Sequence, residues 1–482
     1  MISTKLNTSE TSNSYIIPIF ESEIIGEKIK QIPSSIKFEN WTLLEHFKGS
    51  AKETLLSVGE NKIYFLGLGK KREASAVSKV FRSFFYNNKS KLSGNVSILL
   101  DHDDLGEFAE AIANGIYLAK YNLGMLKTNQ KAENNWFSGE SELNFVSEKA
   151  VEKDLAKGKM MAETQMRIMR LVDSPANYKT PQILSEEIEK IGKSSGFAVK
   201  IYDEKQCKEL GLKALLAVSK GSVENPARFV IMEYTHPEAI KKVGLIGKGV
   251  TFDTGGVSLK PGDNMNYMKS DMGGAAAVIG TLDMAAKLGL KVNIVGAVAL
   301  TENCIDSLAI KPGDVIGSYL GKTIEVINTD AEGRLILADA LAYVKKNHQP
   351  DVLIDLATLT GNCIQALGYA AAALLSNNDD LAQSLINSGQ TTGEKVWRMP
   401  LWDDYKDMMK SDVADIKNLS SAPIAGAITA AKFLEEFIDG HTKWAHLDIA
   451  GVAFSDSEYG SMKSSTGYGV KLLVHWLENQ AN

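Results

Sequence analysis

The hydrophobic and polar positions of the chain follow two alternating patterns. Short apolar runs of strand length are bounded by Gly, Pro, Asn or Asp, and amphipathic stretches with helical periodicity lie between them. The predicted strands cover residues 62–69, 95–100, 142–148, 197–203, 227–234, 243–253, 291–300, 351–361 and 444–453. The predicted helices cover residues 107–122, 149–171, 272–289 and 334–347.

Near-continuous apolar strands that alternate with helices predict an α/β protein. We expect a smaller N-terminal α/β domain over residues 1–150, where the sequence offers no cluster of metal ligands or nucleophile partners. A linking helix over 151–172 is followed by a Pro- and Asn-containing loop. A larger C-terminal domain is expected over 173–482, with a central, mostly parallel sheet covered by helices on both faces.

Composition narrows the setting of the protein. The length of 482 residues favours two or three domains, and the net charge of −6 argues mildly against a nucleic-acid partner. Three widely spaced cysteines are typical of free thiols in a reducing compartment. The polar first fourteen residues lack the pattern of a secretory signal, and the apolar runs fall short of the roughly 20 residues that span a membrane. These features favour a cytoplasmic protein without a membrane partner.

Charged residues gather where predicted strands end and helices begin. They lie in three segments, GKGVTFDTGG (247–256), VSLKPGDNMNYMKSDMGG (257–274) and NTDAEGRL (328–335). Because ligands of parallel sheets collect at the carboxyl ends of the strands, we expect these side chains to converge. The candidate residues are Lys248, Asp253, Lys260, Asp271, Asp330, Glu332 and Arg334.

Each of these residues taken alone also has a structural interpretation. Thr329 and Glu332 have the spacing of a capping box at a helix start. Asp271 could be the N-cap of the helix that follows it, and Asp253 could be a turn residue before Thr-Gly-Gly. Lys248 could be a solvated lysine, although a lysine at the end of an apolar strand is costly without a partner.

Four converging carboxylates favour a metal centre over these separate interpretations. Like charges at that density repel and raise each other's pKa unless a cation neutralises them. Carboxylate oxygens suit Zn²⁺, Mn²⁺ or Mg²⁺, and a lysine amine can join them once it is deprotonated. Two such ions can share a hydroxide and polarise a carbonyl, which is typical of a hydrolase. Lys260 and Arg334 could then stabilise an oxyanion or hold an anion that relays a proton.

Five motifs in this order resemble those of the leucyl aminopeptidase family, the cytosol aminopeptidases. They are GKGVTFDTGGVSLKP, MKSDMGGAAAV, NTDAEGRL, ATLTG and WAHLDIAG. The resemblance covers most of residues 165–482, and only a general similarity extends to the N-terminal domain. It implies a metal-dependent aminopeptidase that releases N-terminal amino acids from peptides, preferentially leucine and other large apolar residues.

The resemblance also implies the composition of the centre, with two divalent metal ions per subunit, Zn²⁺ or Mn²⁺. One ion would be bound by Lys248, Asp253, Asp271 and Glu332. The other would be bound by Asp253, Asp330 and Glu332, so Asp253 and Glu332 would bridge the two ions. A metal-bridging hydroxide would attack the scissile carbonyl, which Lys260 would polarise. Arg334 would hold a bicarbonate ion as general base. The implied metal ligands are Lys248, Asp253, Asp271, Asp330 and Glu332.

Substrate recognition is implied in the same way. The free α-amino group would bind one metal near Asp271, which limits cleavage to the N-terminus. Ala453 stands where some relatives carry methionine, so we expect a wider pocket that accepts Phe or Met alongside Leu. The chain would form a homohexamer of two trimers with its sites facing an interior cavity. The implied pocket residues are Met268, Thr358, Leu359, Gly361 and Ala450.

Other functions remain open at this point. A two-metal carboxylate centre also suits phosphoester hydrolysis, although histidines and a phosphate-binding nest are not evident in these motifs. Some relatives have acquired a nucleic-acid-binding regulatory role, against which the acidic composition weighs. A dipeptidase for Cys-Gly is a narrower alternative within the family. A catalytically dead scaffold is disfavoured because every assigned residue is present.

Overall fold

The computed structural model describes residues 3–6, 12–21, 46–101, 104–128, 136–139, 141–455, 459–460 and 462–480. The chain divides into two compact units, Met1–Glu163 and Thr164–Asn482, and the division falls within helix α4 (Glu152–Asp173). The first fourteen residues, which contribute to the prediction about localisation, lie partly outside these ranges. None of the helices in the described ranges is long and apolar enough to cross a membrane.

The first unit is built on a six-stranded sheet in the order β1-β6-β5-β2-β4-β3, parallel throughout except for the pair β3–β4. Helix α2 (Ala74–Asn88) buries Phe81, Phe84 and Phe85 in the core of this unit, and helix α3 (Ala109–Leu118) lies against α2. The strands are β1 (Ser3–Leu6), β2 (Ser14–Phe20), β3 (Thr54–Val58), β4 (Lys62–Gly69), β5 (Val96–Leu99) and β6 (Glu142–Val146).

The second unit contains an eight-stranded sheet in the order β15-β14-β17-β13-β9-β10-β8-β7. Its central strands β17, β13, β9 and β10 are parallel, whereas β8 is antiparallel to both of its neighbours and β14 is antiparallel to β17. The strands are β7 (Ala198–Tyr202), β8 (Arg228–Tyr234), β9 (Lys242–Asp253), β10 (Asn293–Asn303), β13 (Val352–Ala357), β14 (Ala372–Ser376), β15 (Val396–Arg398) and β17 (Trp444–Asp448).

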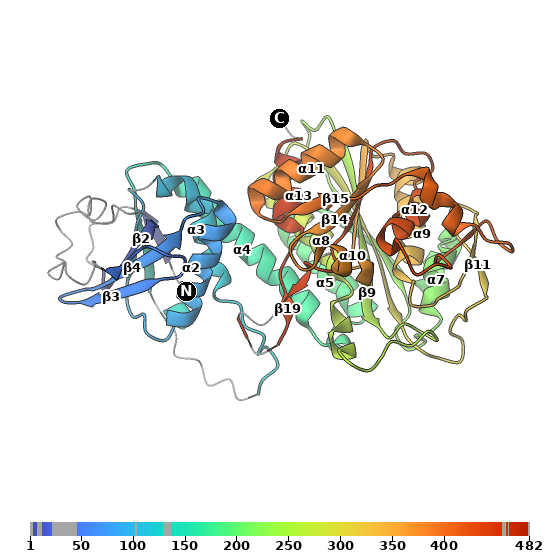
Figure 1. Cartoon of the computed structure of the whole chain (residues 1–482), viewed down its shortest axis with the longest axis horizontal. Coiled ribbons are helices and arrows are strands. Elements are labelled where there is room, and N and C mark those ends of the chain that lie inside the picture. The colour runs from blue at the N-terminus through green and yellow to red at the C-terminus, as the bar shows by residue number, and fades with distance from the viewer. Residues whose placement is uncertain are drawn as a thin grey trace. The chain divides into compact units, whose positions relative to one another are not determined.

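Helices cover both faces of this sheet (Figure 1). On one face α8 (Gly273–Leu288) contacts α5 (Pro181–Ser195) and α13 (Val470–Glu478). On the other face α9 (Gly333–His348) contacts α7 (Lys213–Ser219) and α12 (Gly426–Glu435). The predicted α/β class, with a mostly parallel centre covered on both faces, is confirmed.

Strand β9 separates the two helical layers because its side chains alternate between them. A Cβ atom at Gly244 would lie 3.1 Å from Val344 Cγ1 of α9, whereas one at Gly247 would lie only 2.6 Å from Ala275 Cα of α8. The missing side chain at Gly247 therefore lets the first turn of α8 approach the strand closely.

Two smaller elements complete the surroundings of the sheet edge. The short 3₁₀ helix η5 (Met265–Ser270) leads into α8, and α10 (Gly361–Leu367) follows β13. A three-stranded sheet joins β11 (Val315–Gly317), β12 (Thr323–Glu325) and β16 (Ile416–Lys417). Its parallel pair β12–β16 brings residues beyond 416 next to the loop that precedes α9.

Candidate metal centre

The carboxyl end of β9 supplies the first two charged groups of the candidate centre. Lys248 is 3% exposed and lies on the α9 side of the strand. Further along, Thr301 of β10 pairs with Val250 and Glu302 pairs with Phe252, so Thr251 is an extra residue in β9. This β-bulge shifts the alternation by one position, which directs Asp253 to the same side as Lys248.

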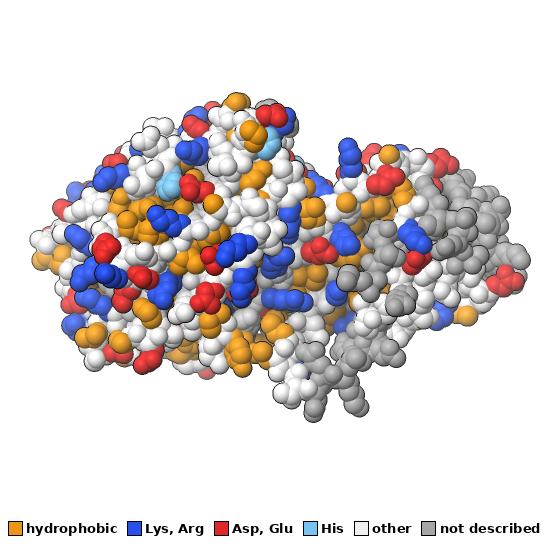
Figure 2. Space-filling model, turned by 180° about the vertical axis from the view of Figure 1, so that it is seen from behind, with side chains coloured by type: hydrophobic (Ala, Val, Ile, Leu, Met, Phe, Trp, Pro, Cys, Tyr) orange, Lys and Arg blue, Asp and Glu red, His pale blue; other side chains and the backbone are white. Residues whose placement is uncertain are grey.

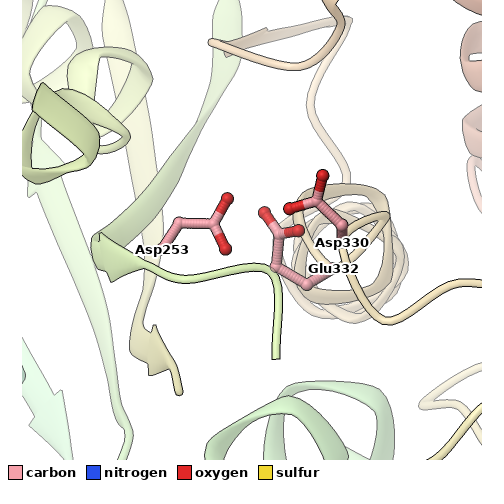
Figure 3. Close-up of side chains that lie close together, drawn as sticks. All are labelled: Asp253, Asp330 and Glu332. Atoms are coloured by element: carbon pink, nitrogen blue, oxygen red, sulfur yellow. The ribbon is translucent and has the colours of Figure 1, made fainter. Parts of the chain in front are cut away.

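The loop before α9 supplies the next two carboxylates. One oxygen each of Asp253, Asp330 and Glu332 lies within 4.8 Å of the others. Figure 3 shows the three carboxylates pointing toward one another, Asp253 from the end of β9 and the other two from beside the start of α9. Glu332 is 1% exposed, and the side chain of Asp330 is 33% exposed, so the cluster opens to solvent on the Asp330 side.

The capping-box interpretation of Thr329 and Glu332 is wrong. Helix α9 begins at Gly333, and no side chain caps its N-terminus. The Thr329 hydroxyl instead donates to the carbonyl oxygen of Gly255 at 2.6 Å and accepts from the Ser258 backbone N–H at 2.8 Å. Thr329 therefore ties the loop before α9 to the loop after β9, and Glu332 is free to face the other carboxylates.

Two lysines lie among the carboxylates. Lys248 Nζ is 2.7 Å from Asp271 Oδ2 and 2.8 Å from Glu332 Oε1, which contradicts the interpretation as a solvated lysine. Lys260 Nζ is 2.8 Å from Asp253 Oδ2 and also contacts Asp330 Oδ1. Four carboxylates and two ammonium groups leave the cluster with an excess of negative charge.

Asp271 and Asp253 are each held by further hydrogen bonds. Helix α8 is capped at Met272 without a side-chain bond, so Asp271 is not its N-cap. Asp271 instead accepts from Thr358 Oγ1 at 2.7 Å. Asp253 is also the turn residue that the sequence allowed, because its Oδ1 accepts from the Gly255 backbone N–H at 2.9 Å. The other oxygen of Asp253 stays directed at Lys260.

Burial and mutual repulsion perturb the titration of this cluster. Burial raises the pKa of Glu332 and the charge of Asp253 raises it further, while for Asp271 burial outweighs the opposing effect of Lys248. The pKa of Asp330 is raised for the same reasons, burial first and then Asp253. Burial alone would lower the pKa of Lys248, but the surrounding carboxylates reverse the direction. The two lysines therefore do not supply enough positive charge to keep the pKa values of these carboxylates at their usual level.

These residues fit divalent metal ions. Glu332 Oε2 is buried and accepts no hydrogen bond from the described part of the chain, although a carboxylate oxygen buried in this way is costly without a partner. A metal ion between these oxygens would neutralise the excess charge and favour the ionised carboxylates. Clustered carboxylate oxygens with a nearby amine suit Zn²⁺ or Mn²⁺.

Arg334, the last residue of the predicted set, is buried in the first turn of α9. Its Nη1 donates to the carbonyl oxygen of Asn418 at 2.8 Å, and its Nε has no hydrogen-bond partner among the described residues. Room for the neighbouring Lys248 comes from Gly333, where a Cβ would lie 2.6 Å from Lys248 Cε.

Sequence reasoning missed two asparagines that hold the cluster. Asn303, at the end of β10, donates through Nδ2 to Asp253 Oδ1 at 2.8 Å and to the Thr329 carbonyl at 3.1 Å. Asn418 lies against the loop before α9 from a segment more than 80 residues downstream. Asn303 could have been suspected, because it follows a predicted strand at the same edge, whereas the sequence near Asn418 carries no signal.

The predicted pocket residues lie around the same edge of the sheet. Asp448 Oδ1 accepts from the backbone N–H groups of Leu359 at 3.1 Å and Ala450 at 3.2 Å, which brings these two residues together. A Cβ at Gly273 would meet both Ala453 Cβ at 3.1 Å and Thr358 Cγ2 at 3.3 Å.

The two remaining predicted pocket residues, Gly361 and Met268, lie in the short helices α10 and η5. Gly361 begins α10 and is exposed, with open space where its side chain would be. Met268 lies in η5, three residues before Asp271.

Comparisons with known proteins identify relatives of this chain. The catalytic-domain model of the cytosol aminopeptidase family matches residues 167–474. A probable cytosol aminopeptidase of Chlorobium phaeobacteroides is 48% identical over 386 residues, covering 78% of this chain and 76% of the relative. A probable cytosol aminopeptidase of Chloroherpeton thalassium is 43% identical over 442 residues, covering 87% of this chain and 86% of the relative.

Solved structures resemble the whole chain. A mutant of tomato leucine aminopeptidase matches with a TM-score of 0.86 and 31% identity, covering 99% of this chain and 97% of the other. The bottromycin maturation enzyme BotP in complex with Mn matches with a TM-score of 0.86 and 29% identity, covering 98% of this chain and all of the other. On the extent of the family match and the identity to its members, this chain belongs to the cytosol aminopeptidase family.

Proposed function

We propose that this protein is a two-metal aminopeptidase that removes leucine and other large apolar residues from the N-termini of peptides. The observation that carries the proposal is the carboxylate cluster of Asp253, Asp330 and Glu332, of which Asp253 and Glu332 are buried, with Asp271 and two lysines beside it. Membership of the aminopeptidase family supports the hydrolytic activity. The manganese complex of the similar enzyme BotP supports a divalent metal.

The proposed ligands are the five residues of the cluster that face its centre. Divalent ions bound there supply a Lewis acid that polarises the peptide carbonyl and an activated water as nucleophile. From the family resemblance, Asp253 and Glu332 are proposed as the residues that would be shared between the two ions, which is supported by their position in one cluster with Asp330. The proposed metal ligands are Lys248, Asp253, Asp271, Asp330 and Glu332.

Lys260 and Arg334 are proposed to act on the reacting groups. The Lys260 ammonium lies between Asp253 and Asp330 on the open side of the cluster, where it can donate to the oxyanion that develops on the scissile carbonyl. Arg334 keeps one buried guanidinium nitrogen without a partner among the described residues, which favours a bound anion such as bicarbonate. An anion held there would accept the proton that the attacking water loses.

The preference for the N-terminus is proposed to come from the α-amino group of the substrate. Asp271 lies at the buried end of the cluster, held by Thr358 and Lys248, and offers a carboxylate to an amine. The side chain of the first residue would then lie over Met268, Leu359, Gly361 and Ala450. Ala453 is a small residue beside Gly273 and Thr358, which supports a pocket wide enough for Phe.

Two further properties are proposed from the family alone. The family resemblance implies a homohexamer. The names of the cytosol aminopeptidase relatives support action on peptides in the cytoplasm. On the face drawn in Figure 2, lysines and arginines are interspersed with acidic side chains. Sedimentation analysis of the purified chain would test the hexamer.

The activity is tested with Leu-Gly-Gly and its N-acetylated form. The protein is first stripped with a chelator, and Zn²⁺ or Mn²⁺ is then added back. The proposal expects leucine release from the free peptide only, and only with metal. Cleavage of both peptides would refute the role of the α-amine. Cleavage of neither, together with metal-dependent hydrolysis of a phosphate ester, would replace the proposal by the phosphoester alternative.

A further inference from the structure

The loop between β12 and α9 carries Asp330 and Glu332. Few of its backbone N–H and C=O groups are hydrogen-bonded within a helix or a sheet. Residues 326–332 belong to neither a strand nor a helix, and several of them are buried. Buried backbone N–H and C=O groups are costly unless they are hydrogen-bonded. The position of Asp330 and Glu332 therefore depends on what satisfies this loop.

A single side chain satisfies much of the loop. Asn418 is completely buried, and its Oδ1 accepts from the backbone N–H groups of Ile327 at 2.8 Å and Asn328 at 3.4 Å. Its Nδ2 donates to the carbonyl oxygens of Asn328 at 2.7 Å and Ala331 at 3.4 Å. Both halves of the amide are used, which neither a carboxylate nor an apolar side chain of this size could reproduce.

The backbone of Asn418 connects the same loop to Arg334. Its carbonyl oxygen accepts from Arg334 Nη1 at 2.8 Å. One residue thus bonds to the backbone on both sides of Asp330 and to the arginine that lies two positions beyond Glu332.

The small sheet holds Asn418 in place. Strand β16 pairs in parallel with β12, and the backbone N–H of Asn418 continues this ladder by donating to Glu325 O at 2.9 Å. The Thr323 backbone N–H also donates to the Asp415 carboxylate at 2.7 Å. Because these hydrogen bonds fix β16 against β12, the Asn418 amide reaches the loop from a fixed position.

We propose that Asn418 is a positioning residue for the metal centre and for Arg334. This inference rests on the proposed function. It adds that the geometry of Asp330, Glu332 and Arg334 depends on the buried Asn418 amide, which lies outside the cluster. Residues that orient metal ligands typically change metal affinity or activity by about 10- to 100-fold when they are replaced.

The test compares Asn418→Asp with the wild-type protein. Asp keeps the size and the acceptor but places an oxygen against the carbonyls of Asn328 and Ala331. Asn347→Asp is the matched control, because Asn347 is an exposed residue near the other end of α9, where its Nδ2 donates to Tyr343 O. Metal affinity is measured by titration of the stripped protein with Mn²⁺. The geometry of the metal site is compared through the absorption spectrum of the Co²⁺-loaded protein. Turnover is measured with Leu-Gly-Gly.

We expect Asn418→Asp to raise the Mn²⁺ dissociation constant by about 10- to 100-fold and to change the Co²⁺ spectrum. At saturating metal, kcat should fall by a similar factor while KM changes little, because the apolar pocket is untouched. The control should match the wild type. If Asn418→Asp does not fold, Asn418→Ser is measured in the same way.

Several outcomes would overturn the inference. Wild-type metal affinity and kcat in the folded variant would show that the loop holds itself in place. Failure of both variants to fold would assign Asn418 a purely structural role. A wild-type protein that neither binds Mn²⁺ nor cleaves Leu-Gly-Gly would instead refute the proposed function, so the two failures can be told apart.

Discussion

Substitution of Gly333 by alanine should separate activity from stability. Gly333 is the first residue of α9, and a Cβ there would lie 2.6 Å from Lys248 Cε and 2.7 Å from its Nζ. Carbon atoms in contact lie about 3.5–4.0 Å apart, so the Lys248 side chain has to retreat by about 1 Å. Its amine would then leave Asp271 and Glu332, from which it now lies 2.7 and 2.8 Å away.

The expected magnitudes differ for the two properties. Misplacement of a group by about 1 Å in an active site can cost about 100-fold in rate, so kcat/KM should fall by about that factor. The free energy of unfolding should fall by about 2 kcal/mol at most. Alanine is favoured over glycine in a helix by about 1 kcal/mol, which partly offsets an overpacking cost of about 1–3 kcal/mol.

The assay combines urea unfolding with kcat/KM for Leu-Gly-Gly at saturating Mn²⁺. Gly280→Ala on α8 is the matched control, because its Cβ would meet Val470 Cγ2 at 2.7 Å, in contact with an apolar side chain instead of the metal cluster. This control should show a similar stability change and unaltered kcat/KM. Wild-type kcat/KM in folded Gly333→Ala would refute the assignment of Lys248 to the centre.

Three further predictions concern other parts of the catalytic unit. Lys260→Met should lower kcat by about 10²- to 10³-fold in initial-rate assays, because it removes a donor to the oxyanion, and an unchanged kcat would contradict that role. Ala453→Met should lower kcat/KM for a Phe-amide relative to a Leu-amide by about 10-fold or more, and equal effects on both would show that Ala453 does not line the pocket. Burial raises the pKa of Glu394 from 4.5 to about 7, although its carboxylate accepts from the Gly469 and Leu472 backbone N–H groups. The folded chain therefore keeps a proton that the unfolded chain releases, so stability should fall as the pH rises from about 4.5 to 7, and urea midpoints of Glu394→Gln should lack this part of the slope.

The sequence predicted six of the eight strands of the large sheet and the helices α8 and α9, because their burial patterns are local, but it did not predict α5, α7, α12 and α13. Near-continuous apolar runs identified β9 and β10, and helical periodicity identified α8 and α9 within a few residues of their observed ends. The family motifs also named the charged residues that the structure brings together.

One local pattern of the sequence was ambiguous, and its structural alternative is wrong. The spacing of Thr329 and Glu332 matches a capping box, but the threonine hydroxyl bonds to Gly255 and Ser258 instead. A contact between segments more than 70 residues apart decided this outcome, and no window of the sequence contains it.

Sequence by itself determined which residues carry charge at the strand ends and that the strands alternate with helices, because both follow from neighbouring positions. Tertiary structure alone decided how those charges are aimed. The extra residue Thr251 in β9 turns Asp253 toward Lys248, and this bulge exists only in the pairing with β10. Asn418 likewise acts only after β16 has paired with β12, because its partners are backbone groups, which every sequence has and no side-chain pattern reveals.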